Sequence, residues 1–215
     1  MYNNFHGEFT DAEGKVRLDL VLRSYFPDYE YKGVMLDIGA YHPIQNNNSY
    51  HFEKNGWDTY CFEANSLMLP SLNKERGKVL NFAISDEDNK DIEFNVVRSI
   101  NGSYAGMSAI DVDPMMAEKF KNWVEETIKV KALTRTLDNI MSKELSSVDK
   151  IDIISLDVEG GEYNVLKGFD LNKWKPKVLL VENYFNKNNL DEYIKGHGYK
   201  LDKKFNADEF YIRES

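Results

Sequence analysis

The stretch V-M-L-D-I-G-A at residues 34–40 decides the fold. Its apolar residues form a short run that is typical of a strand buried on both faces, and the run closes on Asp37 and Gly39. Two further apolar runs also end in acids, T-Y-C-F-E at 59–63 and I-D-I-I-S-L-D at 151–157. Because ligands of parallel α/β sheets bind outside the carboxyl ends of the strands, these acidic strand ends predict one polar ligand site.

Length and composition predict one folded domain over residues 1–215, since 42% of the residues are hydrophobic. The net charge of −9 disfavours nucleic acid as a partner, because binding to phosphates requires clustered Lys and Arg. No apolar run approaches the roughly 20 residues that span a bilayer, so we expect no membrane span. The single cysteine, Cys61, and the lack of a signal-peptide pattern at residues 1–6 favour a cytoplasmic location.

Strand-like and helix-like segments alternate along the chain, which predicts an α/β class with a mostly parallel central sheet flanked by helices. Residues 1–30 are expected to form an N-terminal helical segment, and the last two strands are expected to pair as an antiparallel hairpin. The expected helices cover residues 11–26, 49–55, 67–74, 115–127, 137–145, 162–167 and 189–195. The expected strands cover residues 34–38, 59–62, 79–84, 92–97, 129–133, 151–156, 178–181, 199–203 and 209–212.

A polar, glycine-bearing segment within residues 98–128 predicts a substrate lid. Small residues there would act as hinges, and Tyr104 and Met107 would cover the bound molecules. An ordinary surface loop is the alternative on composition alone.

Four stretches together carry a family resemblance. They are V-M-L-D-I-G-A-Y-H-P at 34–43, G-W-D-T-Y-C-F-E-A-N at 56–65, N-F-A-I-S-D at 81–86 and I-S-L-D-V-E-G-G-E-Y-N-V-L-K-G at 154–168. On these stretches the chain resembles the FkbM family of S-adenosylmethionine-dependent methyltransferases. The resemblance implies a Rossmann-like methyltransferase fold. Two positions depart from the family pattern, because Pro43 stands where a second glycine is common and Ala64 where proline is usual.

The resemblance also implies which residues bind S-adenosylmethionine. An acid after the second strand commonly binds ribose hydroxyls, and a helix N-terminus favours a carboxylate. The implied contacts are Asp37, Gly39, Ala40 and Tyr41 around the methionine part, Asn48 and Ser49 at its carboxylate, Glu63 with the adjoining Ala64 at the ribose, and Ile84 and Ser85 along the adenine.

The chemical half of the site is expected at the next two strand ends. Asp157 follows one strand, and Glu182 and Asn183 follow its neighbour. Their oxygens suit Mg²⁺ or Mn²⁺, in a layout similar to that of catechol O-methyltransferase-like enzymes. The alternative is that Asp157 and Glu182 hold the ammonium of the cofactor. Glu159 is the first candidate for the general base, and His42 is the second.

The resemblance implies O-methylation of a carbohydrate hydroxyl, on a nucleotide-activated sugar or a glycan. Members of the family also methylate polyketides, so a small-molecule acceptor of that type is an alternative. A nicotinamide-dependent oxidoreductase is disfavoured, because the fingerprint G-x-G-x-x-G is absent after Asp37. A non-catalytic binding module is the alternative from a different class. A homodimer is expected, since soluble oligomers are usually twofold symmetric.

Overall fold

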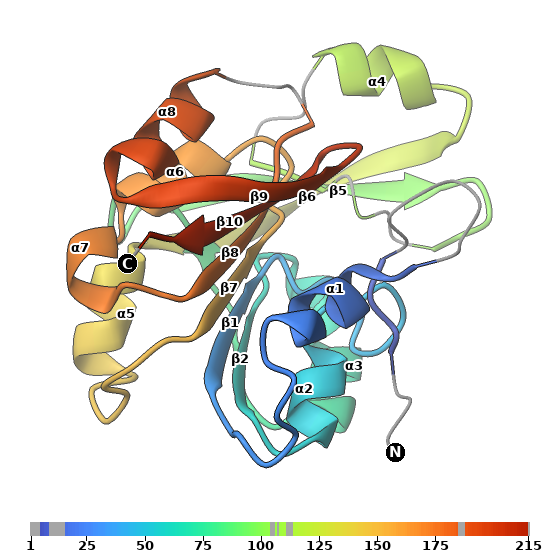
Figure 1. Ribbon diagram of the computed structural model, residues 1–215. Helices are drawn as coiled ribbons and strands as arrows, with labels where there is room; N and C mark the ends of the chain where they lie inside the picture. Colours follow the sequence, from blue (N-terminus) through green and yellow to red (C-terminus); the bar gives the residue numbers. More distant parts are fainter. Residues whose placement is uncertain are drawn as a thin grey trace.

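The computed structural model describes residues 5–8, 16–103, 106, 108–110, 114–184 and 188–214, and its strands form two sheets (Figure 1). The strands are β1 (Val34–Ile38), β2 (Asp58–Phe62), β3 (Val79–Leu80), β4 (Ala83–Ile84), β5 (Asp91–Ser99), β6 (Val124–Arg135), β7 (Ile153–Leu156), β8 (Val178–Glu182), β9 (Tyr199–Phe205) and β10 (Asp208–Arg213).

The central sheet has seven strands in the order β3-β2-β1-β7-β8-β10-β9. The first five strands of this order run parallel, whereas β10 lies antiparallel to both β8 and β9. This arrangement confirms the α/β class, the mostly parallel sheet and the antiparallel C-terminal hairpin. The carboxyl ends of β1 and β7 lie side by side, with Asp37 opposite Ser155.

Helices cover both faces of the central sheet, α5 to α8 on one face and α1 to α3 on the other (Figure 1). Alternate residues of β1 show why, because Leu36 packs among residues of α5 and α6 whereas Met35 packs among residues of α1 and α2. The helices are α1 (Leu18–Ser24), α2 (Tyr50–Lys54), the 3₁₀ helix η1 (Ser66–Met68), α3 (Leu69–Glu75), α4 (Pro114–Phe120), α5 (Leu137–Lys143), α6 (Glu162–Lys167), α7 (Leu171–Trp174) and α8 (Asn188–Gly196).

The second sheet has three strands in the order β4-β6-β5. In its long antiparallel pair of β5 and β6, strand β6 begins at Val124, five residues before the expected strand. The prediction of a helix over 115–127 is therefore wrong for the residues that follow Phe120, where α4 ends. The physical reason is tertiary pairing, because residues 124–127 extend β6 and pair with residues 97–99 of β5 instead of continuing the helix.

The predicted strand over 79–84 is wrong as a single element, because β3 pairs with β2 whereas β4 pairs with β6. Asn81 lies at the break, and its side-chain amide donates to the backbone oxygens of Glu63 and Ala64 at 2.6 and 3.3 Å. The chain therefore leaves one sheet and enters the other between β3 and β4, and this crossing places the two sheets around one space.

Two helices differ from expectation. Helix α1 begins at Leu18, and residues 11–15 of the expected helix lie outside the described residues. The short helix α7 was not expected, and the Asp170 side chain caps it by accepting from two backbone N–H groups.

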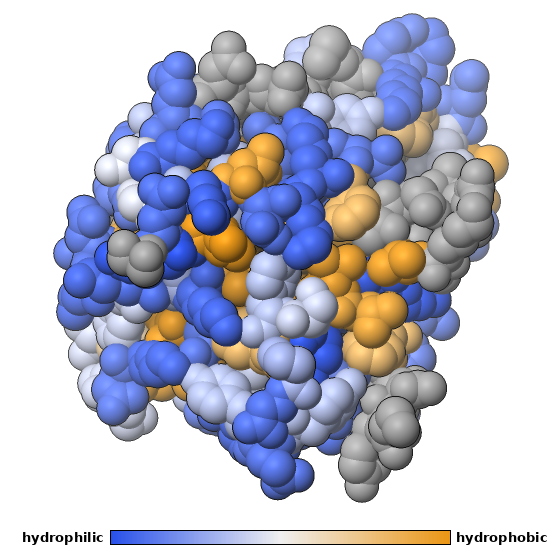
Figure 2. All heavy atoms as spheres, in the orientation of Figure 1, coloured by the Kyte–Doolittle hydropathy of each residue, from blue (hydrophilic) through white to orange (hydrophobic). Residues whose placement is uncertain are grey.

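Hydrophilic residues cover most of the face seen in Figure 2, and apolar residues show there in small groups. None of the helices in the described ranges is both long and apolar enough to cross a membrane.

Candidate active site

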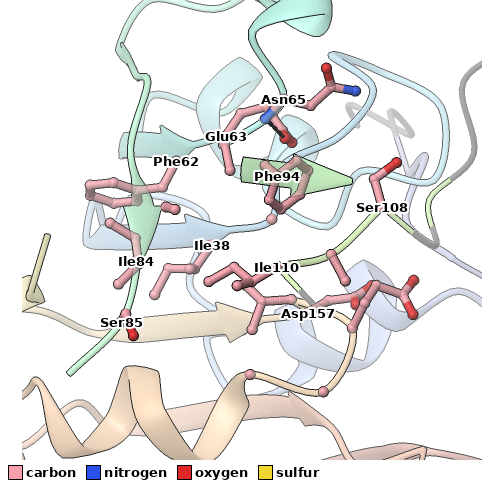
Figure 3. Close-up of a pocket in the computed structure, with 18 of the residues that line it drawn as sticks. Ile38, Phe62, Glu63, Asn65, Ile84, Ser85, Phe94, Ser108, Ile110 and Asp157 are labelled. Atoms are coloured by element: carbon pink, nitrogen blue, oxygen red, sulfur yellow. Dashed lines mark hydrogen bonds between the residues drawn. The ribbon is translucent and has the colours of Figure 1, made fainter. Parts of the chain in front are cut away.

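A cavity of about 570 Å³ lies at the carboxyl ends of the parallel strands, between the central sheet and the second sheet (Figure 3). The end of β1 contributes Ile38, the end of β2 contributes Phe62, and the second sheet contributes Phe94. This is where ligands of open α/β sheets bind, as the acidic strand ends predicted.

One end of the cavity carries the apolar side chains of Phe82, Ile84, Ile92 and Phe94. Ser85 and the charged residues that follow it, Asp86, Glu87 and Lys90, also line the cavity. Flat apolar walls with a polar group at the edge suit an aromatic ring system such as adenine. The structure thus places Ile84 and Ser85 at the cavity, whereas their contact with a cofactor stays a prediction.

Glu63 lies between the apolar end and the loop that follows β1. Its oxygens accept the backbone N–H groups of Tyr41 and Asn65, both at 2.7 Å (the Asn65 bond is drawn in Figure 3). Burial raises the pKa of Glu63 to about 7 against the effect of these hydrogen bonds. A carboxylate offers about four lone-pair sites, so Glu63 retains capacity for a ligand hydroxyl while it fixes two loops.

Gly39 brings the ends of β1 and β7 together. Its φ is +86°, and a Cβ at this position would lie 1.7 Å from the backbone oxygen of Asp157. Its N–H and that of Ala40 donate to the oxygen of Phe62 at 3.0 and 3.1 Å. Gly39, Tyr41 and Ala64 line the cavity. Only a residue without a side chain fits where Gly39 lies.

Asp37 does not line the cavity. Its Oδ2 accepts from Ser49 Oγ at 2.6 Å and from Asn47 Nδ2 at 3.1 Å, in the interior. The buried guanidinium of Arg76 donates to both partners, at 2.7 and 2.8 Å, and its Nε donates to Glu53. The structure thus gives Asp37 and Ser49 contacts that anchor the loop after β1, and direct contact with a cofactor stays a prediction for them.

Two other predicted cofactor contacts, Ala40 and Asn48, also lie outside the cavity lining. Ala40 is buried in a small apolar cluster with Cys61. Asn48 accepts the backbone N–H of Glu8 through its Oδ1, at 3.3 Å.

The other end of the cavity is acidic. One carboxylate oxygen from each of Asp157, Glu159 and Glu182 lies within 4.8 Å of the others. Burial, with repulsion from neighbouring acids, raises the pKa of Asp157 well above its ordinary value, that of Glu159 to about 9 and that of Glu182 to about 7, although a hydrogen bond with Asp157 acts to lower the pKa of Glu182. Asp157 Oδ1 is buried and has no hydrogen-bond partner among the residues that the structure describes. A cation placed here would relieve the repulsion and would occupy that oxygen.

The structure does not bring Asn183 into this acidic group. Its side-chain amide donates to Glu209 at 3.2 Å, away from the cavity. His42 also lies outside the cavity lining, and its Nδ1 accepts the backbone N–H groups of Ile44 and Gln45 at 3.1 and 2.8 Å. Burial lowers the pKa of His42. The metal role of Asn183 and the base role of His42 stay predictions.

Several cavity residues were missed from the sequence. Ile92 and Phe94 alternate with polar residues in β5, and this alternation could have marked them as one apolar face. Glu8 also lines the cavity, but no motif surrounds it, because its position depends on contacts with distant residues. Within the expected lid, Gly106, Ser108 and Ile110 line the cavity, whereas Tyr104 and Met107 lie outside the described residues.

The sheet order and the cavity at its carboxyl edge define an α/β protein and are consistent with a methyltransferase fold. The family profile described as Methyltransferase FkbM domain matches residues 37–201, which is most of the chain. The chain therefore belongs to the FkbM methyltransferase family, as the resemblance predicted, and this family implies S-adenosylmethionine as the cofactor. A comparison with curated proteins gave no match.

Proposed function

We propose that the protein is an S-adenosylmethionine-dependent O-methyltransferase that acts on a carbohydrate hydroxyl. The observation that carries the proposal is the two-ended cavity, apolar beside Glu63 and acidic beside Asp157, in a chain of this family. The apolar end is where we place the adenosine part of the cofactor, and the acidic end is where we place the methyl group and the acceptor.

The residues present fit such a cofactor. The cavity of about 570 Å³ falls within the roughly 300–1,000 Å³ that is usual for ligand sites. Glu63 would accept hydrogen bonds from ribose hydroxyls, and Ile84 would pack along the base. Bound there, the cofactor supplies a methyl group on a positively charged sulfur, and the nearby acidic group suits that charge.

Transfer to oxygen requires alignment of the acceptor hydroxyl and removal of its proton. We assign the removal of this proton to Glu159. Glu159 lines the cavity in the turn after β7 and adopts a φ of 58°. The replacement Glu159→Gln is expected to lower the turnover rate far more than cofactor affinity. Near-normal turnover in that variant would move the role to His42 or to a metal ion.

A divalent cation held by Asp157 and Glu182, with Glu159 beside it as the base, is part of the proposal, because hard cations prefer oxygen ligands. The ion would lower the pKa of a bound hydroxyl. Paramagnetic resonance of added Mn²⁺ tests the site directly: wild-type protein should bind the ion, and Asp157→Asn should weaken binding about tenfold or more. Full activity after rigorous chelation would end the metal hypothesis.

The cofactor assignment is tested by calorimetric titration of the whole chain with S-adenosylmethionine. Wild-type protein should bind it, Glu63→Gln should weaken binding about tenfold, and Glu75→Gln on α3 is the matched control with wild-type affinity. No binding by the wild-type protein would remove the methyltransferase proposal. Binding without turnover on any acceptor would favour a non-catalytic module.

Two further parts of the proposal lie outside the site. We infer a cytoplasmic location, since the one cysteine, Cys61, is a free buried thiol and needs no oxidising compartment. We also infer a homodimer, which sedimentation would detect as twice the 25.0 kDa mass of the chain.

A further inference from the structure

Residues 5–8, here called the N-terminal strap, are tied to the start of α1. The backbone N–H groups of His6 and Gly7 both donate to Asp19 Oδ2, at 2.7 and 2.9 Å. Asp19 is fully buried, so this carboxylate has these backbone donors in place of water. The strap therefore has a fixed path to its last residue, Glu8.

Close packing reinforces that path. A Cβ on Gly7 would lie 2.5 Å from Asn48 Oδ1 and 2.7 Å from Asp19 Cγ. The strap therefore packs this closely against Asn48 and Asp19 only with glycine at position 7. On either side of Glu8 the backbone is also bonded, since its N–H donates to Asn48 and its oxygen accepts from Leu18 N at 2.7 Å. These contacts direct the Glu8 side chain to the cavity, which it lines.

Glu8 lies close to several other carboxyl groups. It interacts electrostatically with Asp157, Glu159 and Glu182, and with Asp208, which pairs with Glu182 in the β8–β10 register. Within the described part of the chain, no lysine or arginine forms an ion pair with any of these five carboxyl groups. Together with Asp157 Oδ1, which has no hydrogen-bond partner among the described residues, this leaves the acidic end without a cationic partner from the described part of the chain.

A divalent ion at the three clustered acids would leave the carboxyl groups of Glu8 and Asp208 without a cationic partner from the described part of the chain. The diphosphate of a nucleotide-activated sugar would place like charge against them, at a high desolvation cost. A group that carries positive charge and donates hydrogen bonds suits the position.

We propose that the acidic end binds acceptors that carry a protonated amine, such as amino sugars, and that Glu8 is one of the residues that bind the amine. This inference rests on the proposed function and narrows its acceptor class. Asp19 is then a positioning residue, since it acts through the strap.

The test compares matched probes on the whole chain saturated with S-adenosylhomocysteine, at a pH where the amine is protonated. Calorimetry should give an affinity for glucosamine about tenfold or more above that for glucose, with glucose 6-phosphate weaker still, and the same order for galactosamine and galactose. Equal affinities within each pair, or no binding of any of these sugars, would overturn the inference.

Variants test which residues produce the preference for amino sugars. In Glu8→Gln, the affinities for glucosamine and glucose should become nearly equal. The affinity of this variant for S-adenosylhomocysteine should stay within about twofold of wild type. Asp19→Asn should reduce the preference in the same direction, with folding checked by thermal melting. Glu30→Gln, on an exposed acid, is the matched control and should keep the preference.

The outcomes separate the two proposals. If S-adenosylhomocysteine does not bind, the proposed function fails and this inference fails with it. If the product binds but Glu8→Gln retains the full preference for amino sugars, only the role of Glu8 is overturned. If Asp19→Asn does not fold, the result for Glu8→Gln alone tests the role of Glu8 in binding the amine.

Discussion

At the scale of single residues, Gly39 is the position where backbone conformation and packing act together. Its φ of +86° is a conformation that other residues rarely adopt, and the backbone oxygen of Asp157 occupies the place of a Cβ. The ends of β1 and β7 can therefore lie this close only because glycine follows β1.

The replacement Gly39→Ala should consequently lower the free energy of unfolding by about 3 kcal/mol or more, since the strand ends must separate to admit the methyl group. Urea denaturation measures the change. Gly196→Ala is the matched control, because nothing lies within 4 Å of a Cβ at that position. The control should be neutral or stabilising by up to about 1 kcal/mol. Similar stabilities for the two variants would contradict the packing argument.

At the scale of elements, the loop between β1 and α2 depends on a side chain from the end of α3. Arg76 donates to Asn47, to Ser49 and to Glu53, and its side chain has no exposed surface. Lysine at this position could not make the same three contacts, because it lacks the planar fork.

We expect Arg76→Lys to lower the free energy of unfolding by about 2–4 kcal/mol, as for other broken buried networks. Chemical denaturation checks this value. The matched substitution Arg98→Lys changes an arginine whose ion pairs with Glu125 and Glu126 lie on the surface, so its effect should stay within about 0.5 kcal/mol. Equal losses in both variants would show that the Arg76 network contributes no more than a surface pair.

The same network predicts a pH dependence. Burial would raise the pKa of Glu53, but the charge and hydrogen bonds of Arg76 outweigh it and hold the pKa below the ordinary value of 4.5. Because the folded pKa is depressed, the stabilisation by Glu53 is present above pH 4.5 and is lost as the pH falls through the folded pKa. Denaturation curves at decreasing pH should therefore show a smaller loss in Glu53→Gln than in wild type. If wild type and Glu53→Gln lose the same free energy of unfolding as the pH falls, Glu53 is not the source of the pH dependence.

Elements also differ in how well the sequence predicts them. The strands that end in Asp37, Glu63 and Asp157 are predictable, because each is a short apolar run closed by an acid. The strand break at Asn81 is not, since it depends on which sheet each half can pair with. Glu8 is the residue of the site that the local sequence predicts least, because contacts with Asp19, Asn48 and Leu18, all distant in the sequence, bring it to the cavity.

At the scale of the whole molecule, the cavity joins the two sheets, so a bound ligand contacts both. A ligand that binds only the folded state at one hundred times its Kd adds about 2.7 kcal/mol to the free energy of unfolding. For a chain of 215 residues this corresponds to a Tm increase of roughly 5–10 °C.

We expect S-adenosylhomocysteine to produce this increase in a thermal melt. NAD at the same concentration should produce little change, because the chain lacks the glycine-rich loop that holds a pyrophosphate. The reverse order of effects would favour the oxidoreductase alternative over the methyltransferase.

The outermost strand of the central sheet, β9, has a consequence for the behaviour of many copies in solution. An open strand edge is a template on which other chains can add, and from which fibrils can grow. The seven residues Y-K-L-D-K-K-F of β9 include three lysines and one aspartate, so two such edges repel one another. At the opposite edge, β3 has only two residues and offers little to extend. Both edge strands of the central sheet, β9 and β3, thus disfavour edge-to-edge pairing between molecules. We therefore expect the open sheet to resist aggregation at high concentration.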